Sequence, residues 1–280
     1  MKLALMGAGG KMGCRITDAL SGNRDYEVSH VEIAPAGIAR LKERGVAPVP
    51  QNHALEDAAI VVLAIPDVLI GKVAREIVPK LKAGTIVVGL DPAAAFAGVL
   101  PQRGDITYFI CHPTHPPLFN DETDPKARVD WFGGIAKQNV VCALFQGPEE
   151  HYPIGEKLVR QMFRPIINTY RITVEQMAIL EPALVETFTS TLVVAMKEAF
   201  DEAVKLGVPE DAARAFLMGH LRIQFAVIFG YADFPFSDGA LYAISKARDL
   251  IFKPDWKSRI MNLESIKRSV AEITQSTQKS

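Results

Sequence analysis

The sequence predicts an α/β protein in which a mostly parallel sheet is followed by an all-α region. Three observations predict this fold class. The chain begins with an apolar run, residues 3–6, that leads into a turn with four glycines and then into a helical pattern. Short β-branched runs then alternate with helical segments, as is typical of a buried parallel sheet. From residue 173 onwards, the apolar spacing is helical almost to the end of the chain.

The elements follow from this spacing in order. Strands are expected near residues 3–6, 26–34, 60–65, 85–90, 106–111, 139–145 and 166–172. Helices are expected between them over residues 14–20, 36–44, 67–82 and 148–164. A capping box that starts at Thr173 opens the helical region, where further helices are expected near residues 182–206, 209–230, 238–252 and 255–274. We therefore predict two domains, residues 1–172 and residues 173–280.

The glycine turn reads GAGGKMG, which has one residue more than a strict G-x-G-x-x-G pattern. A strand, a glycine turn and a helix in this order place a pyrophosphate on the helix N-terminus. The missing Cβ atoms let backbone N–H groups approach the phosphates. A tight turn without a ligand is the alternative. The predicted contacts to the phosphates are Gly7, Gly9, Gly10, Lys11, Met12 and Gly13.

Glu32 ends the next strand-like run and follows Gly13 at nearly the spacing at which a carboxylate meets the adenosine ribose. A carboxylate at this position also repels a 2′-phosphate, which favours NAD over NADP. The simpler alternative is a polar residue at the end of a strand in a βαβ unit. Together with the glycine turn, Glu32 predicts that residues 1–172 form an NAD-binding Rossmann domain.

Two further strand ends carry candidate site residues, because ligands of open α/β sheets bind outside the carboxyl ends of the strands. Pro66 and Asp67 are predicted to line the nicotinamide half of the cofactor, although an Asp cap on the next helix explains them equally well.

In CHPTHPP, three prolines stiffen a loop that carries His112 and His115. Imidazoles suit acid–base work or metal binding, and the alternative is that they only pack. His112, nearer the strand end, is the stronger candidate.

Glu181 and Glu186 lie in an apolar stretch, AILEPALVE. A buried carboxylate without a partner is costly, so at least one of the two is a site candidate. In a continuous α-helix, five residues correspond to about 500° of rotation, so the two would not share a face. We expect Pro182 to interrupt the helix and to turn Glu181 towards a cleft. The alternative is one capping and one exposed glutamate.

The composition limits the function classes. Hydrophobic residues make up 49% of the chain and the net charge is −1, which argues against partners such as nucleic acid or a membrane surface. Three scattered cysteines indicate a reducing, cytoplasmic location, and no run reaches the roughly 18 uncharged apolar residues of a membrane span. The helix over 182–206 is apolar on most sides, so we expect it at the centre of a homodimer or, alternatively, enclosed within a monomer.

The domain order resembles the superfamily of 6-phosphogluconate and β-hydroxyacid dehydrogenases, although the region of Glu181 and Glu186 replaces the usual catalytic Lys and Asn. The segments GAGGKMG, ITYFICHPTHPPLFNDETDP, GGIAKQ, ALFQGPEEHY and AILEPALVE more specifically resemble the D-apionate oxidoisomerases of bacterial apiose catabolism. The likeness covers essentially the whole chain. It implies NAD-dependent oxidation of a small branched sugar acid, D-apionate, and an α-ketol shift that gives 3-oxo-isoapionate.

This chemistry leaves two mechanisms open. In the first, a divalent metal such as zinc or manganese, held by His112 and Glu181, polarises the carbonyl and the tertiary alkoxide. In the second, His112 or His115 is the base, and Glu186 or Glu181 orients it.

Two other functions share the same sequence features. One is a plain NAD-dependent dehydrogenase of another hydroxy acid, β-hydroxyacid or prephenate-like, and the other is a non-enzymatic dinucleotide sensor.

Overall fold

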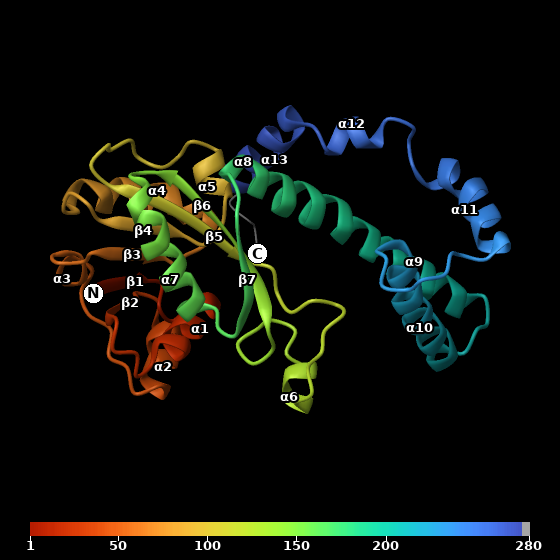
Figure 1. Cartoon of the computed structure of the whole chain (residues 1–280), viewed down its shortest axis with the longest axis horizontal. Helices are drawn as coiled ribbons and strands as arrows, with labels where there is room; N and C mark the ends of the chain where they lie inside the picture. The colour runs from red at the N-terminus through yellow and green to blue at the C-terminus, as the bar shows by residue number, and fades with distance from the viewer. Residues whose placement is uncertain (276–280) are drawn as a thin grey trace. The chain divides into compact units, whose positions relative to one another are not determined.

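The structure, a computed structural model, describes residues 1–275 of the 280-residue chain (Figure 1). Its chain forms two compact units. Of the described residues, the first unit contains Met1–Leu180 and residues 267–275, and the second contains Glu181–Ile266. The change from strands to helices occurs where the sequence predicts it, between residues 171 and 174. The predicted domain limits themselves, 1–172 and 173–280, remain a prediction.

The first unit contains one seven-stranded sheet with the order β2-β1-β3-β4-β5-β6-β7. The first five strands are parallel to one another, whereas β6 runs antiparallel to β5 and β7 runs parallel to β6. The predicted α/β class with a mostly parallel sheet is therefore confirmed. The strand bounds are β1 Lys2–Met6, β2 Glu27–Val31, β3 Ile60–Leu63, β4 Ile86–Gly89, β5 Thr107–Pro113, β6 Gln138–Gln146 and β7 Ile166–Arg171.

Helices cover both faces of this sheet, so its central strands are buried on both sides. All residues of β3 and β4 are buried, which explains their continuous β-branched runs. Alternate residues of β1 point to opposite faces of the sheet. Leu3 packs in the apolar cluster that contains Ile16 of α1 (Lys11–Leu20), and Ala4 packs in the cluster that contains Ile70 of α4 (Asp67–Ile77). The sheet thus holds the strand ends of the site on a rigid support.

The helices of the first unit connect these strands (Figure 1). The predicted helix over 67–82 is divided into α4 and a short 3-10 turn that contains Pro79, and the capping box at Thr173 is present at the start of α8. The bounds are α1 Lys11–Leu20, α2 Pro35–Glu43, α3 Gln51–Leu55, α4 Asp67–Ile77, η1 Val78–Lys80, α5 Ala93–Phe96, α6 Pro125–Arg128, η2 Glu149–His151, α7 Tyr152–Met162 and α8 Val174–Ala178.

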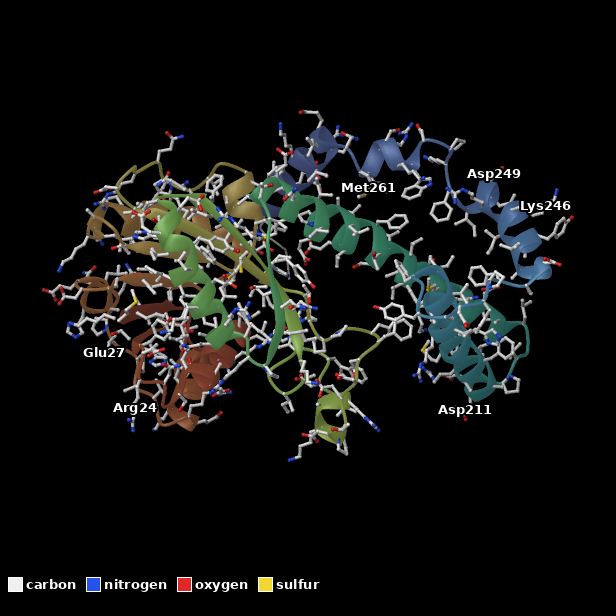
Figure 2. The ribbon with its side chains drawn as sticks, in the orientation of Figure 1. Arg24, Glu27, Asp211, Lys246, Asp249 and Met261 are labelled. Carbon is white, nitrogen blue, oxygen red and sulfur yellow. The ribbon has the colours of Figure 1, made fainter. Side chains whose placement is uncertain are left out.

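The second unit is built from helices (Figure 2), and few side chains of α9, α10 and α11 are buried. Phe200 is the one buried residue of α9, and α10 and α11 bury none of theirs. Among the described residues 1–275, the helix over 182–206 is therefore mostly exposed, and its place at the centre of a homodimer remains a prediction. The helical bounds from η3 onwards are η3 Ile179–Thr189, α9 Ser190–Lys205, α10 Glu210–Ile228, α11 Asp238–Ile251, α12 Trp256–Ile260 and α13 Leu263–Gln275.

The helical stretch Val174–Lys205 is long and apolar enough to cross a membrane by length and composition. Its most apolar window has a mean hydropathy of 1.4, and 22% of that window is buried. The central helix of a soluble assembly meets the same criterion, and ionisable Glu181 and Glu186 lie within the stretch. Most of this apolar window is therefore exposed in the part of the chain that the structure describes.

Candidate functional site

The glycine turn lies at the carboxyl end of β1, which has β2 on one side and β3 on the other. This position is the switch point of the sheet, at which open α/β folds bind their ligands. Gly7 adopts φ +73°, and a Cβ on it would lie 2.4 Å from the carbonyl oxygen of Ala64. Only glycine fits such a conformation at such a distance. The turn therefore lies where the sequence predicts the cofactor site.

Helix α1 begins at Lys11, so its first turn presents the N–H groups of Lys11, Met12 and Gly13. Gly10 is the N-cap, and glycine has no side chain that could cap these groups. Uncapped N–H groups and the helix dipole together suit an anion such as a pyrophosphate. A Cβ on Gly13 would lie 2.1 Å from the carbonyl oxygen of Gly7, so this glycine lets the helix pack closely on the turn.

Glu32 follows β2, and its carboxylate faces the glycine turn. Its Oε2 accepts a hydrogen bond from the N–H of Gly9 at 2.9 Å. Its Oε1 accepts hydrogen bonds from the N–H groups of Ile33 and Ala34, both at 2.8 Å. A Cβ on Gly37 would meet the carboxylate at 2.6 Å, so α2 also packs against it. These contacts fix a negative charge beside the turn, as the NAD prediction requires.

Pro66 is the N-cap of α4, and Asp67 is the first residue of that helix, at the carboxyl end of β3. The N-cap Pro66 forms no side-chain cap hydrogen bond, and Asp67 is a half-buried acidic residue of the first turn. Burial raises the pKa of Asp67 to about 6; the charge of Asp91 also raises it, and His112 opposes this shift. Asp67 is therefore part of an electrostatically linked group rather than a simple helix cap.

His112 lies in β5, and its imidazole faces the end of β4. Its Nδ1 is 3.0 Å from the carbonyl oxygen of Leu90 and 3.7 Å from Oδ2 of Asp91. Because a carbonyl oxygen can only accept, Nδ1 carries the proton and donates to Leu90. In the neutral ring, Nε2 is then the nitrogen that accepts a proton. This is the tautomer that a general base requires.

Asp91 is a further candidate site residue, which the strand-end reasoning missed. Its Oδ1 accepts a hydrogen bond from the N–H of Ala93 at 2.7 Å, which fixes the carboxylate at the end of β4. Its side chain and that of His112 are each 20% exposed. The signal was present in the sequence, because Asp91 follows a strand in the same way as Asp67. The carboxyl ends of β3, β4 and β5 thus bring Asp67, Asp91 and His112 together.

His115 lies beyond the end of β5, in the proline-rich loop. It adopts φ +60°, a conformation that is uncommon for any residue other than glycine. Its Nδ1 is 3.1 Å from the carbonyl oxygen of Phe132, and the two rings pack at a centroid distance of 5.3 Å. The loop is therefore held in place by residues that are distant in the sequence, in addition to its prolines.

Glu181 and Glu186 lie in η3, a π-helical segment that includes Pro182. Proline has no N–H to donate, which favours a wider turn here. In a π-helix, hydrogen bonds join residues five apart, so Glu181 and Glu186 lie about one turn apart. The α-helical regularity is thus interrupted in the segment of Pro182, as expected, and the turning of Glu181 towards a cleft remains a prediction. Side-chain hydroxyls reinforce the same spacing: Thr187 donates to Pro182, Thr189 to Leu184 and Ser190 to Val185.

Among residues 1–275, no group of three or more His, Cys, Asp and Glu side chains is arranged to hold a metal ion. His112 belongs to the first unit and Glu181 to the second. Their joint binding of a metal therefore remains a prediction.

Comparison with known proteins places the chain in a family. Residues 120–274 match the family described as phosphogluconate dehydrogenase (decarboxylating) C-term, and residues 2–91 match the one described as NADP oxidoreductase coenzyme F420-dependent. A D-apionate oxidoisomerase of Rhizobium rhizogenes is 51% identical over 274 residues, which are 97% of this chain and 99% of the relative. Another, from Cupriavidus necator, is 50% identical over 275 residues, 98% of this chain and 99% of the relative. The chain belongs to the D-apionate oxidoisomerase family.

A solved structure supports the same assignment. It is a semialdehyde dehydrogenase NAD-binding protein of Cupriavidus necator in complex with calcium and NAD. This structure is 49% identical to the chain, covers 97% of it and 99% of its own length, and has a TM-score of 0.95. The predicted family, the Rossmann domain with a helical C-terminal region and the oxidoreductase class are thereby confirmed.

Proposed function

We propose that this protein binds NAD at the glycine turn and oxidises D-apionate. The observation that carries the NAD assignment is the Glu32 carboxylate, fixed against Gly9 beside the uncapped N-terminus of α1. The first turn of α1 would hold the pyrophosphate, and Glu32 would bind the ribose hydroxyls. Bound NAD supplies a hydride acceptor. Relatives named for D-apionate over nearly the full length support the substrate.

The reaction has two steps with different requirements. In the first, the secondary alcohol of the acid loses a proton to a base and a hydride to NAD, which gives a 2-oxo acid and NADH. In the second, the tertiary alcohol is deprotonated, and one of its carbon substituents migrates with its bonding pair to the carbonyl carbon. The former tertiary carbon becomes the ketone of 3-oxo-isoapionate. The shift is redox-neutral, so one NAD is reduced for each molecule of product.

We assign the base of this reaction to His112. Its Nδ1 donates to Leu90, so Nε2 can take the proton of a substrate hydroxyl. The Asp91 carboxylate at 3.7 Å from Nδ1 stabilises the imidazolium that forms. His115, in the rigid loop, is proposed to bind a polar group of the substrate. Glu181 and Glu186, about one turn apart on η3, are proposed to orient the base or to bind a divalent cation such as zinc or manganese.

The experiment that tests this function measures NADH formation from D-apionate by the purified protein, with chelator and with added manganese or zinc. NMR of the product separates the candidate reactions. A migrated carbon skeleton supports the oxidoisomerase, and an unrearranged 2-oxo acid indicates a plain dehydrogenase. NAD binding without turnover on any hydroxy acid would indicate a sensor. Loss of product in chelator, and its return with metal, would assign a role to the cation.

We further propose that the protein is a homodimer assembled through the helical unit. Large apolar side chains on α10 and α11 are exposed in the single chain, among them Phe216, Ile223, Ile228, Leu241, Tyr242, Leu250 and Ile251. An apolar surface of this extent on a water-soluble enzyme is a mark of an interface. A second copy offers the same apolar faces in return, as a two-fold interface requires. Sedimentation velocity at several concentrations tests this, and a monomer at micromolar concentration contradicts it.

The proposed location is the cytoplasm. Cys14, Cys111 and Cys142 are buried thiols without a disulfide. Burial raises the pKa of Cys142 to about 12 and that of Cys111 well above the usual range, so both thiols are unreactive. Fractionation of cells that produce the protein checks the assignment, and recovery with the membranes contradicts it.

A further inference from the structure

The loop that follows α6 is held in one conformation by a single carboxylate. Asp130 accepts hydrogen bonds from the N–H groups of Gly133, Ile135 and Ala136 at 2.8, 2.8 and 3.0 Å. Burial alone would raise the pKa of Asp130, but these backbone hydrogen bonds outweigh it, and the pKa is lowered. Gly133 adopts φ +95°, which a side chain would strain. The loop therefore presents Phe132, between Asp130 and Gly133, in a fixed orientation.

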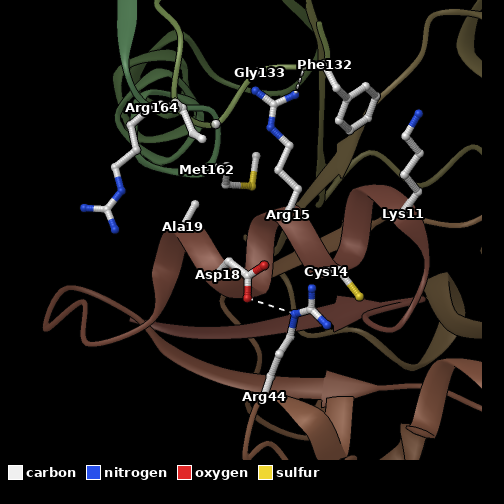
Figure 3. Close-up of a pocket in the computed structure, with 12 residues that line it drawn as sticks. Lys11, Cys14, Arg15, Asp18, Ala19, Arg44, Phe132, Gly133, Met162 and Arg164 are labelled. Carbon is white, nitrogen blue, oxygen red and sulfur yellow. Dashed lines mark hydrogen bonds and ion pairs between the residues drawn. The ribbon is translucent and has the colours of Figure 1, made fainter. Parts of the chain in front are cut away.

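The carbonyl oxygen of Phe132 has two donors from different parts of the first unit. Arg15 of α1 donates to it through Nη1 at 2.9 Å, and His115 approaches it through Nδ1 at 3.1 Å. Figure 3 shows the Arg15 guanidinium beside Phe132 and Gly133. Since a carbonyl only accepts, His115 carries its proton on Nδ1, so Nε2 is the accepting nitrogen of the neutral ring.

The aromatic ring of Phe132 also contacts residues of the proline-rich loop and of α1. It packs on the imidazole of His115 at a centroid distance of 5.3 Å. The ammonium of Lys11, the first residue of α1, lies 3.8 Å from the ring centroid, and the Arg15 guanidinium lies at 5.2 Å. Such cation–π contacts stabilise the ring where it is. Phe132 is thus shared between the helix that is proposed to hold the cofactor phosphates and the imidazole that is proposed to meet the substrate.

We propose that Phe132 is a positioning residue that sets the orientation and the tautomer of His115 and fixes both to the first turns of α1. This inference rests on the proposed function, because it gives His115 a role at the substrate. His115 needs such support, since its φ of +60° is costly and persists only where its surroundings impose it. The ring of Phe132 restricts the imidazole from one side, and its carbonyl fixes Nδ1.

The primary test substitutes Phe132→Ala and measures kcat and KM for both substrates. We expect kcat to fall on the order of tenfold or more, because a small misplacement of a reacting group has such an effect. Phe132→Tyr, which retains the ring, is expected to restore most of kcat. Trp131→Ala is the matched control, since this neighbouring aromatic side chain is 80% exposed, and it is expected to leave kcat unchanged. Phe132→Leu replaces Phe132→Ala if the alanine variant does not fold.

A double-mutant cycle with His115→Ala decides whether Phe132 acts through His115. If it does, Phe132→Ala has almost no further effect on kcat in the His115→Ala background. Equal losses in both backgrounds would overturn the inference, because Phe132 would then act independently of His115.

NMR of the imidazole protons provides a readout that does not depend on turnover. The His115 signals, assigned by their loss in His115→Ala, are expected to shift in Phe132→Ala and to keep their positions in Trp131→Ala. Unchanged signals in Phe132→Ala would overturn the positioning role. If His115→Ala retains full kcat while the signals shift, the proposed role of His115 in the reaction fails and its positioning by Phe132 stands.

Discussion

The sheet unit and the helical unit differ in how much of their apolar surface each buries. In the first, β3 and β4 are buried along their whole length, and helices cover both faces of the sheet. In the second, α10 and α11 bury no side chain, although they carry residues as large as Phe216 and Tyr242. The first unit thus has its own core, whereas the described helices α10 and α11 of the second leave their apolar side chains exposed.

Candidate site residues lie in both units, but on different kinds of support. His112, Asp91 and Asp67 stand at the ends of buried parallel strands, so the core of the first unit fixes them. Glu181 and Glu186 lie on a π-helical segment of the second unit. π-Helical segments occur frequently at functional sites because they are retained for geometry rather than for stability.

The largest expected effect is on the chemistry of the first unit. We expect His112→Asn to lower kcat by about 10²–10⁴-fold, the usual contribution of a general base. NAD binding and the thermal midpoint of unfolding should change little, because the core is untouched. Stopped-flow measurement of hydride transfer checks the loss, and calorimetric titration with NAD is the control. Near-normal kcat would move the base to another residue and contradict the assignment.

Matched truncations compare the buried core of the first unit with the exposed apolar surface of the second. Ile60→Ala removes a fully buried side chain from β3 and should cost about 2–5 kcal/mol of unfolding free energy at any protein concentration. Ile228→Ala, on a residue that is 63% exposed in the single chain, should cost less at low concentration and more as the dimer forms. Urea unfolding at two concentrations measures both. An Ile228→Ala effect independent of concentration would argue against the homodimer.

A charge on the apolar helix tests the assembly itself. Val194→Lys places an ammonium on α9 at a position that is 58% exposed in the single chain. If a second copy covers this position, the buried charge should weaken dimerisation by a few kcal/mol. Sedimentation velocity measures the change, and Glu198→Gln, an exposed position of the same helix, is the control. An unaltered dimer would place the interface elsewhere.

A smaller effect concerns the choice of cofactor. Glu32→Gln keeps the side-chain length but removes the charge beside the glycine turn. We expect the ratio of kcat/KM for NAD to that for NADP to fall on the order of tenfold, because the repulsion of a 2′-phosphate is lost. Initial rates with both cofactors measure this ratio. If it stays the same, Glu32 serves only to hold the N–H groups of Gly9, Ile33 and Ala34.

The smallest expected effect is on the pH dependence of stability. The pKa of Asp67 is raised from 3.8 to about 6, so between these values the folded chain holds a proton that the unfolded chain has released. Stability therefore falls as the pH rises from about 4 to about 6. Asp67→Asn should remove this decline, a difference on the order of 1 kcal/mol after solvent screening. Thermal unfolding of both proteins across this pH range tests it, and parallel profiles would contradict the shift.

Much of the candidate site could be proposed from the sequence because it depends on local signals. The glycine turn at Gly7, the carboxylate of Glu32 and the histidine at a strand end each follow from residue type and spacing. Asp91 was missed although the same strand-end reasoning applies to it, because its contact with His112 depends on the pairing of β4 with β5. The sequence predicted that Pro182 interrupts the regular helix, but residue type and spacing did not specify the π-helical form that brings Glu181 and Glu186 about one turn apart.

By itself, the sequence determined the fold class, the order of elements and the cofactor turn, since hydrophobic period and glycine positions are properties of neighbouring residues. Only the tertiary structure decided which strand ends meet, how Phe132 holds His115, and that the helical unit leaves its apolar faces exposed. These features join residues that are distant in the chain, and they depend on packing and hydrogen bonds that no local pattern records.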